Sequence, residues 1–215
     1  MLGSMRKHAG SWVIKLVFGL IILSFALFFG YNQIESSRVE AERLMALVGN
    51  RPISRQEYEA RLDEAYDRIR ESLKGEAPPN LETLLKSTIL QQLISREVSC
   101  LFANSLGIEV SDPSVARAIQ QDPSFSPQGT FDLAGYQRYR SLYRQRYGED
   151  WEMELRKRLA LERLEAFGEI AFGPWNRVLQ EPDPKAAPID SRQLLSQWMD
   201  PFRERTKIKL YRNRS

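Results

Sequence analysis

The amino-acid sequence predicts an all-α protein, mainly helical, with a small two-stranded β ribbon and one N-terminal transmembrane helix. Three observations lead to this fold class. An uncharged apolar run near the N-terminus is long enough to cross a membrane, apolar residues recur at helical spacing through most of the remaining chain, and a short strand-like segment lies at each end of that remainder. A chain of 215 residues is long enough for one domain of ordinary size and a membrane anchor.

The predicted transmembrane helix comprises residues 12–31. No charged residue occurs from Leu16 to Ile34, and Trp12 and Tyr31 mark the two ends of the span. Because a helix rises about 1.5 Å per residue and the hydrocarbon core is about 30 Å thick, roughly 20 apolar residues suffice to cross it. Amphipathic aromatic rings favour the headgroup regions at both interfaces.

The flanking charges give the orientation of this span. Arg6, Lys7 and Lys15 precede or open it with no acidic residue among them, and positive charge is retained on the cytoplasmic side. We therefore expect residues 1–11 in the cytoplasm and the main domain beyond the membrane. A cleaved signal peptide is the alternative, because residues 24–26 form a small-x-small triplet. However, the apolar run continues past the triplet, where a polar cleavage region should begin.

Composition argues against several classes of function. The net charge of +3 is well mixed along the chain, which does not favour nucleic-acid binding. Cys100 is the only cysteine; we interpret it as a buried apolar residue, with a reactive or partner-linked thiol as the alternative. His8 is the only histidine and precedes the span, so the outer domain has none for a catalytic triad or a metal site. We expect no cofactor, no metal and no enzymatic activity.

The predicted helical domain comprises residues 44–173. It opens with a strand from Leu44 to Val48, followed by a turn that Pro52 closes. Ser54 and Glu57 have the spacing of a capping box at the start of the first helix. N-cap, glycine and proline residues separate the helices that follow. These helices are expected over residues 55–74, 81–106, 112–121, 133–147 and 149–172.

The C-terminal part is predicted to return to the start of this domain. Gly173-Pro174 is expected to end the last of those helices, and residues 174–190 read as a proline-rich linker. Residues 191–215 then supply a short helix, which ends near Pro201, and a final strand.

The two-stranded ribbon is predicted from two segments that have no other partner, Leu44 to Val48 and Lys207 to Tyr211. A lone strand leaves its backbone N–H and C=O groups unpaired, so we expect the two segments to pair. In this arrangement Ile208 and Leu210 should pack against the helices while the alternating lysines face water.

Eight aromatic side chains are candidates for a polypeptide-binding groove. Tyrosines recur three or four residues apart in the helix over 133–147, with several arginines between them. Such a stripe fits core packing, and it also fits a groove for extended apolar chains. The acidic residues that follow argue against nucleic acid. The candidates are Tyr58, Tyr66, Phe125, Phe131, Tyr136, Tyr139, Tyr143 and Trp151.

Three stretches, in this order, carry a resemblance to a known family. They are MLGSMRKHAGSWVIKLVFGLIILSF, ALVGNRPISRQEYEARLDEA and LLKSTILQQLISREVSCLFANSLGIEVSDPSVARAIQQDPSFSPQGTFDLAGYQRY. The first resembles the membrane anchor of PpiD-type periplasmic folding factors. The second and third are similar to the N-terminal chaperone domain of SurA and PpiD, including an LGI-x-VSD step and an F-x-x-x-G-x-FD loop. The resemblance covers residues 1–172.

This resemblance implies an inner-membrane-anchored periplasmic chaperone, a holdase for unfolded or newly translocated polypeptides. Relatives of this kind usually carry a parvulin prolyl-isomerase module with a histidine after the fifth helix, and residues 174–190 are too few to contain it. The resemblance therefore implies the chaperone half without the isomerase half. Expected partners are unfolded or translocating polypeptides, translocon-associated membrane proteins and, through the anchor, the lipid bilayer. The alternative is a membrane-anchored scaffold or assembly subunit for one dedicated partner.

Overall fold

The computed structural model describes residues 43–73, 80–127, 129–180 and 190–211. Within it, Leu44–Tyr211 form one compact unit. The predicted transmembrane helix and cytoplasmic segment lie outside the described residues. Among the helices that are described, none has the length and apolar character that a membrane span requires.

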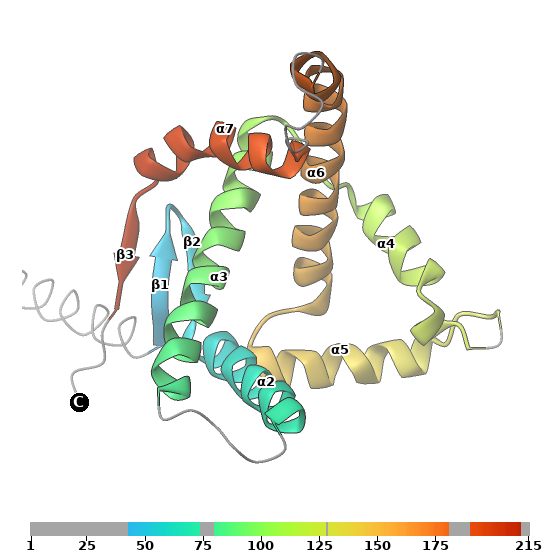
Figure 1. Cartoon of the computed structure of the whole chain (residues 1–215). Helices are drawn as coiled ribbons and strands as arrows, with labels where there is room; N and C mark the ends of the chain where they lie inside the picture. The colour runs from blue at the N-terminus through green and yellow to red at the C-terminus, as the bar shows by residue number, and fades with distance from the viewer. Residues whose placement is uncertain (1–42, 74–79, 128, 181–189, 212–215) are drawn as a thin grey trace, which may run out of the picture. The chain divides into compact units, whose positions relative to one another are not determined.

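The N-terminal and C-terminal strands pair, as the sequence predicts. β1 (Leu44–Val48) lies at the centre of an antiparallel sheet in the order β2-β1-β3, where β3 is Ile208–Leu210 and β2 is Arg51–Ser54 (Figure 1). The third strand, β2, was not predicted. The sequence predicts that the turn closes at Pro52, but this residue lies inside β2. Pro52 is compatible with β2 because this is an edge strand, where a missing N–H need not break a ladder bond.

The side chains of β3 are more exposed than predicted. Ile208 is 41% exposed and Leu210 is 56% exposed, so the expectation that they pack against the helices is wrong. Their direct partners on β1, Val48 and Ala46, are fully buried. The reason is position: α2 and α3 pack on β1 and β2, whereas β3 is the outer strand beyond that cover.

In the described part of the chain, seven helical elements follow from local sequence signals. Ser54, Asp132 and Asp190 accept backbone N–H bonds, each at 3.0 Å, at the starts of α2, α5 and α7. Gly148, with φ +73°, ends α5 in the left-handed conformation that glycine adopts without strain. The helices are α2 (Arg55–Leu73), α3 (Leu81–Ser105), α4 (Asp112–Gln121), the 3₁₀ turn η2 (Pro123–Phe125), α5 (Leu133–Tyr147), α6 (Trp151–Gln180) and α7 (Ser191–Arg205).

Two helices continue through prolines that were expected to stop them. α6 passes Gly173-Pro174 and ends at Gln180, and α7 passes Pro201 and ends at Arg205. A proline removes one backbone N–H and leaves the bonds of the flanking turns in place, so a helix held on both sides can tolerate it. Of the predicted linker, residues 181–189 lie outside the described part of the chain.

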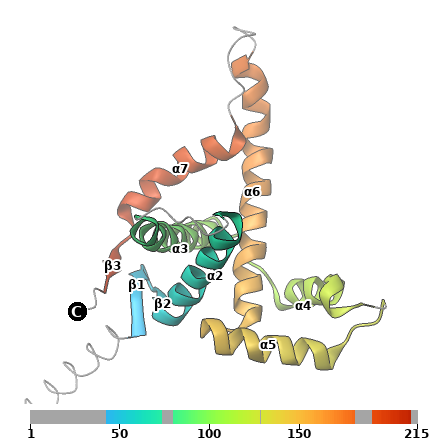
Figure 2. The same ribbon diagram turned by 60° about the horizontal axis from the view of Figure 1, so that its bottom comes forward.

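Three apolar clusters hold the unit together. The sheet cluster joins β1 and β2 to α2 and α3, with Val48, Ile53 and Leu93 among its buried residues. The arm cluster joins α4, η2 and α5 to α6, on the opposite side of α6 from the sheet (Figures 1 and 2). The α7 cluster, made of Phe102, Ala103, Leu164 and Leu195 with their neighbours, fixes α7 across α3 and α6.

Candidate functional site

The eight predicted aromatic residues divide between two of these clusters. Tyr58 and Tyr66 belong to the sheet cluster, where Tyr58 is buried and Tyr66 is half-buried. The other six belong to the arm cluster or pack against it, apart from Tyr139, whose ring contacts its members at the surface. The structure therefore does not bring all eight together along a single groove.

The arm-cluster rings pack mainly on one another. Trp151 lies 5.2 Å from the rings of both Tyr139 and Tyr143, in edge-to-face geometry, and Phe125 lies 5.2 Å from the ring of Tyr136. This geometry matches the electrostatic preference of aromatic rings and stabilises the docking of α5 on α6. Phe125, Tyr136, Tyr143 and Trp151 are buried. Their first role is therefore to form core.

The hydroxyls of the buried residues Tyr58 and Tyr136 have partners, which fits a core position, whereas the hydroxyl of Tyr66 is buried without a partner among the described residues. The hydroxyl of Tyr136 donates to Glu152 at 2.8 Å, and the hydroxyl of Tyr58 donates to the Lys86 carbonyl at 3.3 Å. Burial, followed by the bond to Glu152, raises the pKa of Tyr136. These phenols remain neutral hydrogen-bond donors at physiological pH.

Tyr139 is the candidate that presents most surface, at 39% exposed. Its ring contacts Phe125 and Trp151 on its buried side, and Leu142, three residues along α5, is exposed as well. Phe131 is half-buried beside the same cluster. This pair on α5, Tyr139 and Leu142, is the apolar surface that the predicted stripe leaves accessible.

A second exposed aromatic group was not predicted. Trp198 of α7 contacts the rings of Phe102, Phe167 and Phe172 at 5.0 to 6.1 Å, yet it remains 42% exposed. Ile170, on the same stretch of α6, is 77% exposed. The corresponding signal in the sequence is that apolar residues continue beyond Leu164, at Phe167 and Ile170. We call Phe167, Ile170 and Trp198 the α6–α7 patch.

Charged side chains form a network between α2, α3 and α6. Arg96 contacts Glu154 at 2.6 Å and Glu57 at 3.4 Å, and Lys157 contacts Glu97 at 2.9 Å and Glu149 at 2.8 Å. Burial raises the pKa of Glu57, and the neighbouring Arg96 opposes that shift. Ion pairs this close to the interior fix the mutual positions of the helices that carry them, because breaking one leaves an unpaired charge.

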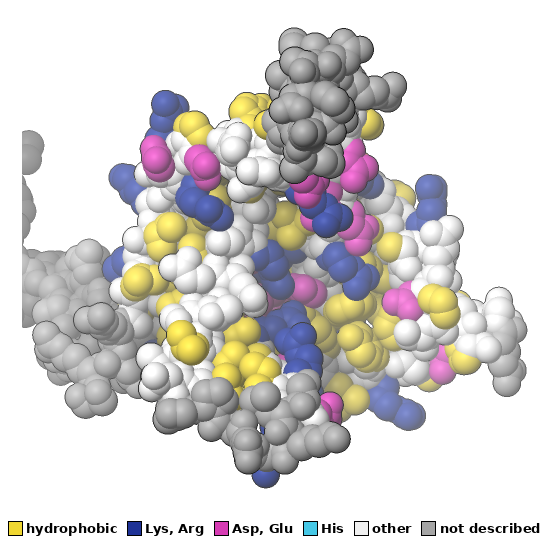
Figure 3. Space-filling view, in the orientation of Figure 1, with side chains coloured by type: hydrophobic (Ala, Val, Ile, Leu, Met, Phe, Trp, Pro, Cys, Tyr) yellow, Lys and Arg dark blue, Asp and Glu magenta, His cyan; other side chains and the backbone are white. Residues whose placement is uncertain are grey.

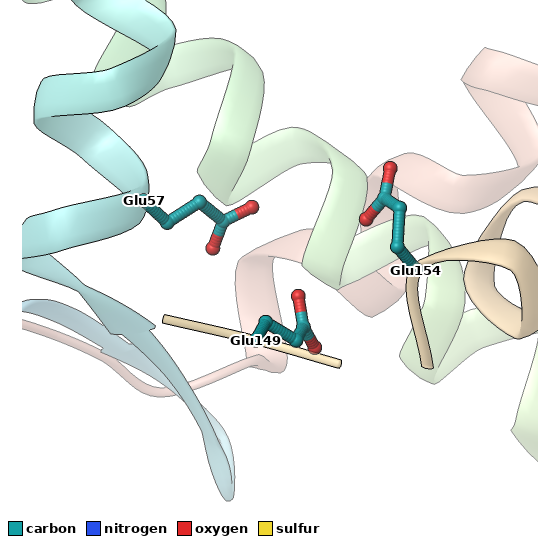
Figure 4. A group of neighbouring side chains, drawn as sticks. All are labelled: Glu57, Glu149 and Glu154. Atoms are coloured by element: carbon teal, nitrogen blue, oxygen red, sulfur yellow. The ribbon is translucent and has the colours of Figure 1, made fainter. Parts of the chain in front are cut away.

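Three of these carboxylates point toward one another, as Figure 4 shows. Oxygens of Glu57, Glu149 and Glu154 all lie within 4.8 Å of one another, a spacing that could suit a cation. Each of the three already contacts a cationic side chain, either Arg96 or Lys157. Arg96 and Lys157 therefore neutralise the three carboxylates, and we assign no metal centre here.

The hollow between α3 and α6 is lined by both charged and apolar side chains (Figure 3). A cavity of about 300 Å³ there includes Arg51, Arg156 and Lys157, and a cavity of about 600 Å³ between α2, α3 and α5 includes four arginines. Cys100 lies in the former and is buried as expected; burial raises the pKa of its thiol to about 11, so it stays protonated and unreactive.

The class of domain to which this helical unit with its small sheet belongs follows from its amino-acid sequence. The chain belongs to the SurA-like N-terminal domain family, which matches residues 1–165. Among curated proteins, the periplasmic chaperone PpiD of Haemophilus influenzae is 31% identical over 144 residues, which cover 64% of this chain and 22% of that relative. PpiD of Escherichia coli strain K12 is 28% identical over 141 residues, covering 63% and 22%.

A third relative is the chaperone SurA of Chromobacterium violaceum. It is 34% identical over 80 residues, which cover 37% of this chain and 18% of that relative. The chain thus spans about a fifth of the length of the curated relatives it matches. No solved structure matches the chain at a significant level. The matched family region ends within α6, so α7 and β3 lie beyond it.

Proposed function

We propose that this protein is an inner-membrane-anchored periplasmic chaperone, a holdase that binds unfolded or newly translocated polypeptides and has no prolyl-isomerase activity. The observation that carries the proposal is membership of the SurA-like N-terminal domain family, together with relatives named as periplasmic chaperones. The anchor follows from the apolar run over residues 12–31, and the orientation follows from the basic residues before it.

The exposed apolar side chains suit this function. Tyr139 with Leu142 forms one site, and the α6–α7 patch forms another. Exposed large apolar groups attract the apolar side chains of unfolded chains, because contact removes both surfaces from water. Of the predicted set, Tyr139, Tyr66 and Phe131 retain accessible surface, and the remaining five would contact a client only if the clusters opened.

The absence of isomerase activity is proposed from the sequence. Residues 44–211 contain no histidine, whereas the parvulin module implied by the resemblance carries one. The family match also concerns the chaperone domain. Without a general acid or base of that type, the barrier to X-Pro rotation should stay at its uncatalysed height.

Photo-crosslinking in intact cells tests the function directly. A photoreactive residue at Tyr139 or Trp198 of the full chain should capture many different periplasmic polypeptides, and one at Gln137 or Gln197, exposed positions on the same helices, should capture fewer. A single stoichiometric product from both aromatic positions would instead indicate a scaffold for one partner. A reporter placed after Ser215 should be active only in the periplasm.

A further inference from the structure

The outer edge of β3 has backbone groups that the sheet does not use. Gly49 donates its N–H to the Lys207 carbonyl at 2.8 Å, and Tyr211 donates its N–H to the Met45 carbonyl at 3.0 Å. Because hydrogen-bonded residues alternate along an antiparallel pair, the N–H and C=O groups of Ile208 and Leu210 point away from β1. Within the described residues, no strand pairs with that side of β3.

The apolar face of the sheet continues onto this edge. Ile208 and Leu210 lie directly opposite Val48 and Ala46, so all four side chains are on the same face. The β1 residues are fully buried and the β3 residues are not. A further strand beside β3 would place every second side chain next to Ile208 and Leu210 and would cover them.

The charges of β3 restrict what that further strand can be. Lys209 lies between Ile208 and Leu210, and Lys207 immediately precedes the strand; both lysines are exposed. If β3 of a second copy paired here in full antiparallel overlap, Lys209 would lie directly opposite Lys209 of that copy. Like charges directly opposite in a sheet are destabilising, so a second copy is disfavoured. Acidic residues at these positions would be favoured.

We propose that the outer edge of β3 accepts an extended polypeptide segment as a fourth strand, and that it prefers segments in which apolar and acidic residues alternate. This proposal rests on the proposed chaperone function and names a class of client segment. The main-chain bonds would supply sequence-tolerant affinity, and Ile208, Leu210 and Lys209 would supply the preference. Because β3 is only three residues long, the contact should be weak and quickly reversible, as a holdase requires.

Two peptides and one charge reversal test the preference. Fluorescence anisotropy with the full chain should show Val-Glu-Val-Glu-Val-Glu-Val binding at least tenfold tighter than Val-Lys-Val-Lys-Val-Lys-Val. Lys209→Glu should reverse that order. An unchanged order in Lys209→Glu would overturn the proposal.

A matched pair of variants tests the strand geometry. Leu210→Pro and Leu210→Ala both remove the leucine side chain, but only the proline removes the outward N–H, and it leaves the bonds to β1 in place. Leu210→Pro should weaken binding of the acidic peptide at least fivefold more than Leu210→Ala. Equal affinities would overturn the proposal.

A peptide variant gives the same test without altering the protein. N-methylation of alternate residues that face β3 should abolish binding, and N-methylation of the intervening residues should not. Equal effects of the two patterns would contradict strand addition.

If the wild-type chain holds an unfolded test protein in solution and Lys209→Glu leaves both peptide affinities unchanged, the edge proposal alone fails. If the wild-type chain binds neither peptide nor unfolded protein, the proposed function fails with it.

Discussion

The guanidinium group of Arg96 donates to both carboxylate oxygens of Glu154, at 3.0 and 2.6 Å, and so ties the middle of α3 to the first turn of α6. Glu154→Gln should therefore leave Arg96 partly buried without its main partner. Because both side chains keep some exposure, we expect a loss of about 2 kcal/mol in the free energy of unfolding, below the usual cost of breaking a fully buried pair. Urea denaturation of the variant measures it.

The exposed pair of Glu82 and Lys86 provides a control for this measurement. Its atoms are as close, at 2.6 Å, but both side chains lie in solvent on one face of α3. Glu82→Gln should leave the unfolding midpoint unchanged, because exposed pairs contribute little. If both variants shifted the midpoint equally, burial would not be what makes the Arg96 contact matter.

Asp150 predicts a dependence of stability on pH. The hydrogen bonds from Arg140 lower the pKa of Asp150 below its ordinary value of 3.8. A folded-state pKa below the unfolded value adds stability above the unfolded value, and this contribution is lost as the pH falls through the folded value. Asp150→Asn should thus be less stable than the wild type at pH 7, with the difference shrinking as the pH falls below the unfolded value and through the folded value. Thermal melts across this range check it; a constant difference would contradict it.

Alanine substitutions at Trp151 and Tyr139 should distinguish a core position from a surface position among the predicted aromatic residues. Trp151 is buried between the rings of Tyr139 and Tyr143, so Trp151→Ala should cost about 3–5 kcal/mol in the free energy of unfolding. Tyr139→Ala should cost about 1 kcal/mol, because much of that ring is already in water. Tyr139→Ala should nevertheless weaken the binding of an unfolded client. If Tyr139→Ala lowered the free energy of unfolding more than Trp151→Ala, Trp151 rather than Tyr139 would be the surface residue.

Two glycines of α6 test how tightly α7 is docked. A Cβ at Gly168 would lie 3.0 Å from a methyl group of the buried Leu195, whereas a Cβ at Gly173 would meet nothing within 4 Å. Gly168→Leu should lower the free energy of unfolding by about 1–3 kcal/mol through overpacking. Gly173→Leu should raise it by up to about 1 kcal/mol through helix propensity. Equal effects would mean that α7 yields easily at this contact.

The C-terminal strand is expected to stabilise the whole unit through its backbone. Deletion of residues 206–215 would leave one edge of β1 unpaired and should lower the melting temperature of the domain clearly. Ile208→Lys should have only a small effect, within about 0.5 kcal/mol, because that side chain is not buried. An unchanged melting temperature after the deletion would show that β3 adds nothing to stability.

Features that depend on neighbouring residues were predictable from the sequence. The caps at Ser54 and Asp132 need only a side chain and the next turn, and Gly148 needs only its own backbone angle. The pairing of β1 with β3 was predicted on the premise that neither segment has another partner. Among the described residues that premise holds for β3 alone, because β1 also pairs with β2.

Features that depend on distant packing were not predictable. Whether Pro52 or Pro174 ends an element depends on the surrounding structure, and here each is accommodated. The periodicity that indicated an aromatic stripe could not separate buried Tyr143 from exposed Tyr139, because exposure depends on where α6 crosses α5. The contact made by Glu57 was not predictable either. Its spacing from Ser54 indicates a local capping box, but its carboxylate contacts Arg96 of α3.

The placement of β3 against β1 has a consequence for how each new copy of the protein matures. β1 is the first of the described elements to be synthesised and β3 is the last, so one edge of the central strand stays unpaired until residues 208–210 have been made. Contacts between such distant segments form slowly, and unpaired strands are prone to wrong association in the meantime. During that interval a nascent copy exposes an unpaired strand edge, the same kind of surface that a mature copy is proposed to bind in other chains.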